Sequence, residues 1–138
     1  MNSSPGPEPI EWTDELVGTF WKYYAEHRQE EYFTNLFGDR IIALTERFIP
    51  ADGAVCDYGC GSGNLVARLL ERHRTAGYDF TAANIEVAAR RVGNHPNLIG
   101  LKVLGEPGLE ARRFQAVYVV ETVEHVVESH LPGFFANL

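Results

Sequence analysis

The fold of this chain can be inferred from one stretch of its sequence, Ala54-Val55-Cys56-Asp57-Tyr58-Gly59-Cys60-Gly61-Ser62-Gly63. Its first half is short and mostly apolar, which predicts a buried parallel strand over 54–58. Its second half is rich in glycine, which lets the backbone turn sharply and lets a ligand approach closely. A helix is expected over 64–72, with Leu65, Val66, Leu69 and Leu70 on one side. The first N–H groups of that helix would favour a carboxylate or phosphate.

Three more strands are expected toward the C-terminus, at 75–79, 98–104 and 115–120. Thr81 is expected to cap a helix that runs to Arg91. The residues expected to face inward from it are Ala82, Ile85, Ala88 and Ala89. Pro132 is expected to start a further helix. This order of apolar strands and helices predicts a Rossmann-like α/β fold, with an open and mostly parallel sheet.

Toward the N-terminus the sequence predicts a disordered lead-in over 1–9 and a helical preface over 10–50, ahead of the domain 51–138. Thr13 or Asp14 can cap the start of the first helix of the preface, and the second helix runs from about Asp39 to Phe48. The apolar sets of these helices are Leu16, Val17, Phe20, Trp21 and Tyr24, then Ile41, Ile42, Leu44 and Phe48. The aromatic residues of 21–24 and Tyr32-Phe33 could form a lid over a ligand, but we expect Phe20, Trp21 and Tyr24 to pack in the core.

Asp79 is expected at the end of the second strand, twenty residues after Gly59. In a doubly wound sheet it would lie over the glycine turn and accept both hydroxyls of a ribose. The glycine turn and Asp79 together favour a nucleoside-type cofactor site over a purely structural surface turn. A dinucleotide site expects glycine or alanine at the position of Asn64, which counts against a nicotinamide-dependent oxidoreductase.

The composition of the chain argues against a membrane-spanning protein and against a protein that binds duplex nucleic acid. A chain of 138 residues, 45% hydrophobic, suits one globular domain, and no apolar run reaches the roughly 20 residues of a membrane span. The net charge of −7 and only two lysines, Lys22 and Lys102, argue against a partner such as duplex nucleic acid. Cys56 and Cys60 have no second pair with which to form a disulfide framework, which favours a reducing, cytoplasmic setting.

The segment 55–63 resembles motif I of class I S-adenosylmethionine-dependent methyltransferases. Gly77-Tyr78-Asp79 resembles the ribose-binding strand end of that superfamily, and 114–121 resembles its fourth strand. The segment 121–126 is similar to one in ubiquinone-biosynthesis O-methyltransferases and in small-RNA 3′-terminal 2′-O-methyltransferases. The resemblance runs from about residue 54 to the end.

This resemblance implies that S-adenosylmethionine is the cofactor and that its methyl group passes to an oxygen or nitrogen of a small molecule. Asp57 would hold the amino group of the cofactor, although its carboxylate is also suited to brace the glycine turn. Asp79 would accept the ribose hydroxyls, Phe80 would lie against the adenine, and Glu106 would reach the adenine edge. The motif I residues expected around the methionine end are Tyr58, Gly59, Cys60, Gly61 and Gly63.

Glu121 and His125 are the catalytic candidates. A hydroxyl nucleophile needs a base, and imidazole is suited to that role near neutral pH. Glu121, Glu124 and His125 would lie on one face of a helix, which suggests a metal site as an alternative. Hard cations need more oxygen ligands than this triplet offers. We therefore favour a satisfied surface histidine or a histidine in the wall of the cofactor pocket, and we expect no metal.

The resemblance also implies a sheet of seven strands, of which four are expected here in the order 3-2-1-4. We therefore expect the cofactor-binding part of a longer enzyme, inactive alone and prone to self-association through its open sheet edge. The non-enzymatic alternative is a degenerate methyltransferase-like domain.

Overall fold

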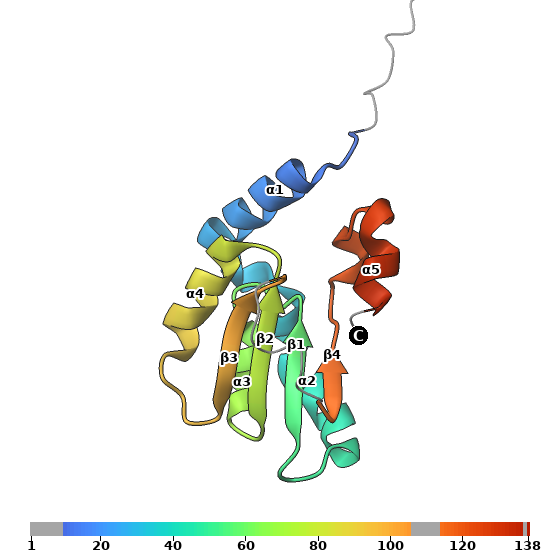
Figure 1. Cartoon of the computed structure of the whole chain (residues 1–138). Coiled ribbons are helices and arrows are strands. Elements are labelled where there is room, and N and C mark those ends of the chain that lie inside the picture. The colour runs from blue at the N-terminus through green and yellow to red at the C-terminus, as the bar shows by residue number, and fades with distance from the viewer. Residues whose placement is uncertain (1–9, 106–113, 137) are drawn as a thin grey trace, which may run out of the picture.

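The computed structural model describes residues 10–105, 114–136 and 138, and a parallel four-stranded sheet lies at its centre (Figure 1). The strands are β1 (Ala54–Tyr58), β2 (Arg74–Asp79), β3 (Leu98–Val103) and β4 (Ala116–Tyr118), in the order β3-β2-β1-β4. Asp57 of β1 lies in register with Gly77 of β2 and Tyr118 of β4. The order confirms the predicted Rossmann-like fold.

Helices α3 (Asn64–Leu70) and α4 (Ala82–Val92) make the crossovers that parallel neighbours require. The four expected inward residues of α3 are all buried. They join two apolar clusters, one with α2 (Phe33–Thr45) and β1, the other with α4 and β3. Alternation along β1 sends Cys56 and Tyr58 to a third cluster with Phe134 of α5 (Leu131–Ala136).

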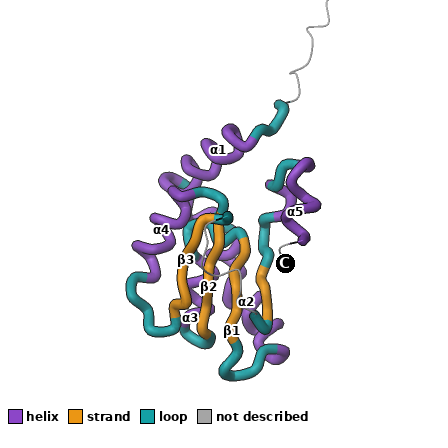
Figure 2. The backbone as a smooth tube through the Cα atoms, viewed as in Figure 1, coloured by secondary structure: helices purple, strands orange, loops and turns teal. Residues whose placement is uncertain are grey.

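Helix α1 (Asp14–His27) lies beyond the carboxyl ends of the strands, where it packs against α4 (Figures 1 and 2). Its N-cap is Thr13, one of the two residues that the sequence offered, and the Thr13 side chain accepts a hydrogen bond from the N–H of Leu16 at 3.3 Å. A short 3₁₀ turn, Gln29–Glu31, leads from α1 to α2. Helix α1 therefore lies at the end of the sheet at which parallel α/β folds bind ligands, whereas α2 packs against α3.

Several expected details are wrong. Helix α2 begins at Phe33 rather than near Asp39. The sequence did not predict its first turns because they lack an amphipathic pattern, since Phe33, Leu36 and Phe37 are apolar and yet exposed. Leu44 and Phe48 are exposed, and Phe48 belongs to a separate 3₁₀ turn, Glu46–Phe48.

The inward face of α4 also differs from the expected one. Ala82 and Ala89 are exposed, while Asn84 and Ala88 are buried. Alanine tolerates either environment, so its spacing is a weak guide to which face is inward. Thr81 stands at the N-cap of α4, but its side chain makes no capping hydrogen bond.

No helix in the described ranges 10–105 and 114–136 is long and apolar enough to cross a bilayer.

Candidate functional site

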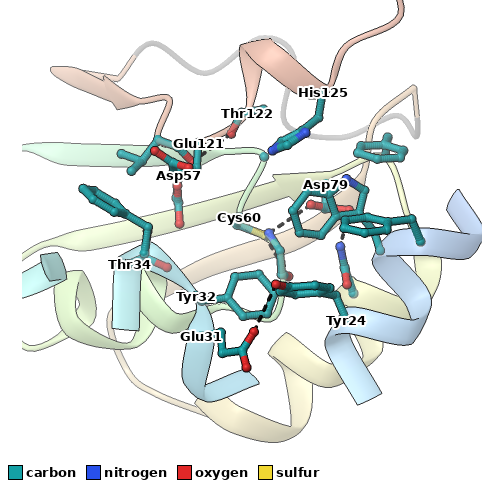
Figure 3. Close-up of a pocket in the computed structure, with 18 of the residues that line it drawn as sticks. Tyr24, Glu31, Tyr32, Thr34, Asp57, Cys60, Asp79, Glu121, Thr122 and His125 are labelled. Carbon is teal, nitrogen blue, oxygen red and sulfur yellow. Dashed lines mark hydrogen bonds between the residues drawn. The ribbon is translucent and has the colours of Figure 1, made fainter. Parts of the chain in front are cut away.

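A cavity of about 410 Å³ opens at the carboxyl ends of β1 and β2, and we call it the first cavity (Figure 3). Its volume lies within the range of roughly 300–1,000 Å³ that is usual for small-molecule sites. The glycine turn after β1, the end of β2 and the segment after β4 form one side. The preface, from α1 to the start of α2, forms the other.

The glycine turn needs its glycines. Gly59, Gly61 and Gly63 have φ values of 86°, 52° and 78°, in the left-handed region that side chains disfavour. The N–H groups of Gly59 and Cys60 both donate to the carbonyl of Tyr78 at 2.8 Å, which joins the turn to β2. A Cβ on Gly59 would collide with the side chain of Thr122. The turn therefore keeps its backbone open toward the first cavity.

Asp79 is only 2% exposed and braces this turn. Its Oδ2 accepts a hydrogen bond from the N–H of Gly61 at 2.9 Å. Its Oδ1 accepts from the N–H of Thr81 at 2.8 Å and from Nδ2 of Asn84 at 3.0 Å. Burial raises the pKa of Asp79, and these hydrogen bonds oppose the rise. The sequence suggested that Asp57 braces the glycine turn, but Asp79 makes these hydrogen bonds. Asp79 also lines the first cavity.

Asp57 is the other buried carboxyl of the first cavity, 2% exposed at the end of β1. Its side chain makes no hydrogen bond or ion pair with another residue of the described chain. Burial, and to a smaller extent the charge of Asp79, raises the pKa of Asp57 to about 7. A cation in the first cavity would oppose both effects and lower the pKa of Asp57, since an opposite charge favours the ionised form. Asp57 is therefore matched to a positively charged ligand group.

The other predicted cofactor contacts divide into two groups. Gly59, Cys60, Gly61 and Phe80 line the first cavity, and Phe80 is 42% exposed there. Tyr58 does not line it, because strand alternation turns its side chain to the opposite face of the sheet, against Tyr78 and Phe134.

Gly63 does not line the first cavity either. It precedes α3 and packs on α4, where a Cβ would lie 2.9 Å from the Cβ of Ala88. Glu106 lies outside the described residues.

The segment after β4 is not the expected helix. Glu121 adopts a φ of 52°, unusual for a residue with a side chain, and is followed by a 3₁₀ turn, Val123–His125. Glu121 and His125 line the first cavity, while Glu124 lines a neighbouring one. The shared helical face is therefore absent. Within the described ranges, no three His, Cys, Asp or Glu side chains are grouped to hold a metal ion.

The preface aromatics are placed differently from the prediction. Phe20, Trp21 and Tyr24 line the first cavity, whereas α1 buries Val17 and Ala25. The rings of Trp21 and His125 meet edge to face, with centroids 4.7 Å apart. In Figure 3 Tyr24 and Tyr32 lie across the first cavity from Asp57 and Glu121. The core-packing interpretation of these three residues is thus wrong.

Tyr32, which the sequence offered as part of an aromatic lid, lies over the glycine turn. A Cβ on Gly61 would lie 3.2 Å from its Cε1 atom. Among the described residues its hydroxyl has no hydrogen-bond partner, and burial raises the pKa of Tyr32 to about 12.

Residues 24–138 match a protein family described as a methyltransferase domain. No curated protein sequence matches this chain. Several solved structures share its fold. A phosphoethanolamine N-methyltransferase of Haemonchus contortus, solved with phosphoethanolamine and S-adenosylhomocysteine, is 18% identical with a TM-score of 0.62. The match covers 91% of this chain and 30% of that one.

Two further structures extend the comparison. The methyltransferase domain of bacterial CtHen1-CN is 25% identical over 73% of this chain and 57% of that one, with a TM-score of 0.57. An S-adenosylmethionine-dependent methyltransferase of Clostridium acetobutylicum is 18% identical over 86% of this chain and 50% of that one, with a TM-score of 0.64. The chain thus spans between 30% and 57% of the length of these three relatives.

Proposed function

Since the chain belongs to this methyltransferase domain family, we propose that it binds S-adenosylmethionine in the first cavity and passes the methyl group to an oxygen or nitrogen of a small molecule. The observation that carries the proposal is Asp57, a buried carboxyl without a partner in the described chain, beside a glycine turn. A buried carboxylate needs a positive partner. The cofactor brings two positive groups, an ammonium and a sulfonium.

The residues around Asp57 suit the rest of the cofactor. Asp57 would hold the ammonium of the methionine end, which lies against the open backbone of Gly59 and Gly61. Asp79 would accept a hydrogen bond from a ribose hydroxyl at Oδ2 while keeping the glycine turn in place, because Oδ2 has two lone pairs and accepts only from Gly61 among the described residues. Phe80 would cover the adenine with its ring.

S-adenosylmethionine, when bound, supplies a methyl group whose bond to sulfur breaks as the acceptor lone pair forms the new bond, leaving a neutral thioether. The protein's main task is alignment. His125 would take the proton that the acceptor oxygen or nitrogen gives up. Glu121, in the segment that follows β4, would lie beside the methyl group. The resemblance of 121–126 to ubiquinone-type O-methyltransferases supports oxygen as one acceptor atom. We also propose that these 138 residues are the cofactor-binding part of the active protein.

Calorimetric titration tests the cofactor assignment, with S-adenosylmethionine, S-adenosylhomocysteine and NAD as the ligands. We expect the first two to bind and NAD not to bind. Asp79→Ala should weaken binding by about 1–3 kcal/mol, the usual effect of losing charge-assisted hydrogen bonds. The exposed Asp52→Ala variant is the matched control and should bind normally.

Binding of NAD without binding of either sulfur ligand would reject the proposal. Cofactor binding by the complete protein without transfer to any acceptor would instead identify a non-catalytic methyltransferase-like domain.

A further inference from the structure

A second cavity of about 520 Å³ adjoins the first. The two share Phe20, Trp21 and His125 as lining residues. The contact between the Trp21 and His125 rings, 4.7 Å between centroids at 74°, lies on this shared wall. In Figure 3 the His125 ring extends from the segment after β4 toward the first cavity. A molecule in the second cavity would therefore contact side chains that also line the proposed site of the methyl donor.

The walls of the second cavity are mainly apolar. Trp12 joins Phe20 and Trp21 as a third aromatic lining residue. The aliphatic lining residues are Val17, Val126 and Val127. Walls of this kind bind an aromatic or aliphatic body, and a few polar groups then fix its orientation.

The charged groups of the second cavity are carboxylates. Glu124 and Glu128 line it, and neither makes an ion pair or side-chain hydrogen bond with another described residue. No Lys or Arg is found among the described lining residues of either cavity. Aromatic faces and carboxylates both attract cations. A phosphate group, such as that of the phosphoethanolamine bound by the Haemonchus contortus enzyme, favours Arg or Lys partners instead.

From this juxtaposition we infer that the second cavity binds a methyl acceptor in which an apolar or aromatic body carries a protonated amine. The inference rests on the proposed methyltransferase function and narrows its acceptor. The body lies among Trp12, Val17 and Val126. The ammonium group lies near the carboxylates of Glu124 and Glu128 and only anchors the molecule. A separate oxygen or nitrogen beside His125 gives its lone pair to the methyl group as the methyl–sulfur bond breaks, and its proton passes to His125.

The chain contains its own reporter of this site. Its two tryptophans, Trp12 and Trp21, both line the second cavity, so intrinsic fluorescence reports on binding there. Three probes share one phenyl body: 2-phenylethylamine, 2-phenylethanol and phenylacetate. At about pH 7.5 the first is a cation and the last an anion. With S-adenosylhomocysteine present, we expect the amine to bind about tenfold more tightly than the alcohol, and the anion more weakly still.

Glu124→Gln with Glu128→Gln should remove most of this tenfold preference. Glu26→Gln with Glu86→Gln is the matched control, because it removes the same charge from exposed residues that line neither cavity. Equal binding of the three probes, or a preference for the amine that survives in the double variant, would overturn the inference. Calorimetry with S-adenosylhomocysteine tests the proposed cofactor binding separately from the acceptor inference. Normal cofactor binding with no preference for the amine would reject only the acceptor inference.

Discussion

The carboxyl of Asp57 couples cofactor binding to protonation. Its pKa of about 7 in the folded chain lies above the usual value of 3.8, so the folded state holds an extra proton between these pH values. Stability should therefore fall as pH rises from about 4 to about 7, and remain lower above that range. Affinity for S-adenosylhomocysteine should rise over the upper part of the same range, because the ammonium needs the ionised carboxylate.

Asp57→Asn tests this coupling, because the amide keeps the shape and does not ionise. Near pH 8 we expect the variant without ligand to be more stable than the unmodified chain by about 2–4 kcal/mol, and to bind S-adenosylhomocysteine more weakly. Denaturant unfolding and calorimetry at several pH values measure the two effects. Asp52→Asn, at an exposed position, should change neither. Equal pH dependence of stability in Asp57→Asn and the unmodified chain would contradict the assignment.

His125 gives a prediction that separates catalysis from binding. In the complete protein, His125→Ala should lower turnover by about 10²-fold or more, while affinity for S-adenosylhomocysteine changes little. A chelator should have no effect on turnover if His125 is a base. His130→Ala is a suitable control, because His130 is exposed and lines neither cavity. Full turnover of His125→Ala would leave this histidine only a structural role.

At the scale of elements, the glycine turn and α4 are held together at Gly63. A Cβ there would lie 2.9 Å from the Cβ of Ala88, and the φ of 78° disfavours a side chain. We expect Gly63→Ala to lower the free energy of unfolding by about 2–4 kcal/mol, from backbone strain and overpacking together. Thermal or denaturant unfolding measures this loss.

Gly18→Ala in α1 is the control for Gly63→Ala. No atoms lie within 4 Å of the position that a Cβ would take on Gly18, and this glycine is not among the residues with positive φ. Alanine there should raise the free energy of unfolding by about 0.5–1 kcal/mol, because it is the better helix former. Similar effects of the two substitutions would show that the contact between the turn and α4 is not tight.

At the scale of the whole molecule, β4 is an edge of the described sheet and pairs only with β1 there. Val117 in its centre is 39% exposed. Such an edge offers unpaired backbone groups and apolar side chains to another chain. We expect the 138-residue chain to self-associate at high concentration, and Val117→Lys to shift it toward the monomer. Sedimentation velocity measures the shift.

Val123→Lys adds the same charge at a similarly exposed valine outside the sheet, so it controls for a general effect of charge. It should leave self-association largely unchanged. A chain that stays monomeric without any substitution would show that the edge of β4 is protected.

The sequence by itself determined the sheet, the bounds of β1, the glycine turn and the place of Asp79 at the end of β2. These features follow from local signals in the sequence, namely an apolar run, a cluster of glycines and the alternation of strands with helices. Only the tertiary structure decided that α1 turns Phe20, Trp21 and Tyr24 toward a cavity rather than into the core. It also decided that Asp79 braces the turn while Asp57 lacks a partner in the described chain. Helical spacing shows which residues share a face, but what that face meets depends on packing between elements distant in sequence.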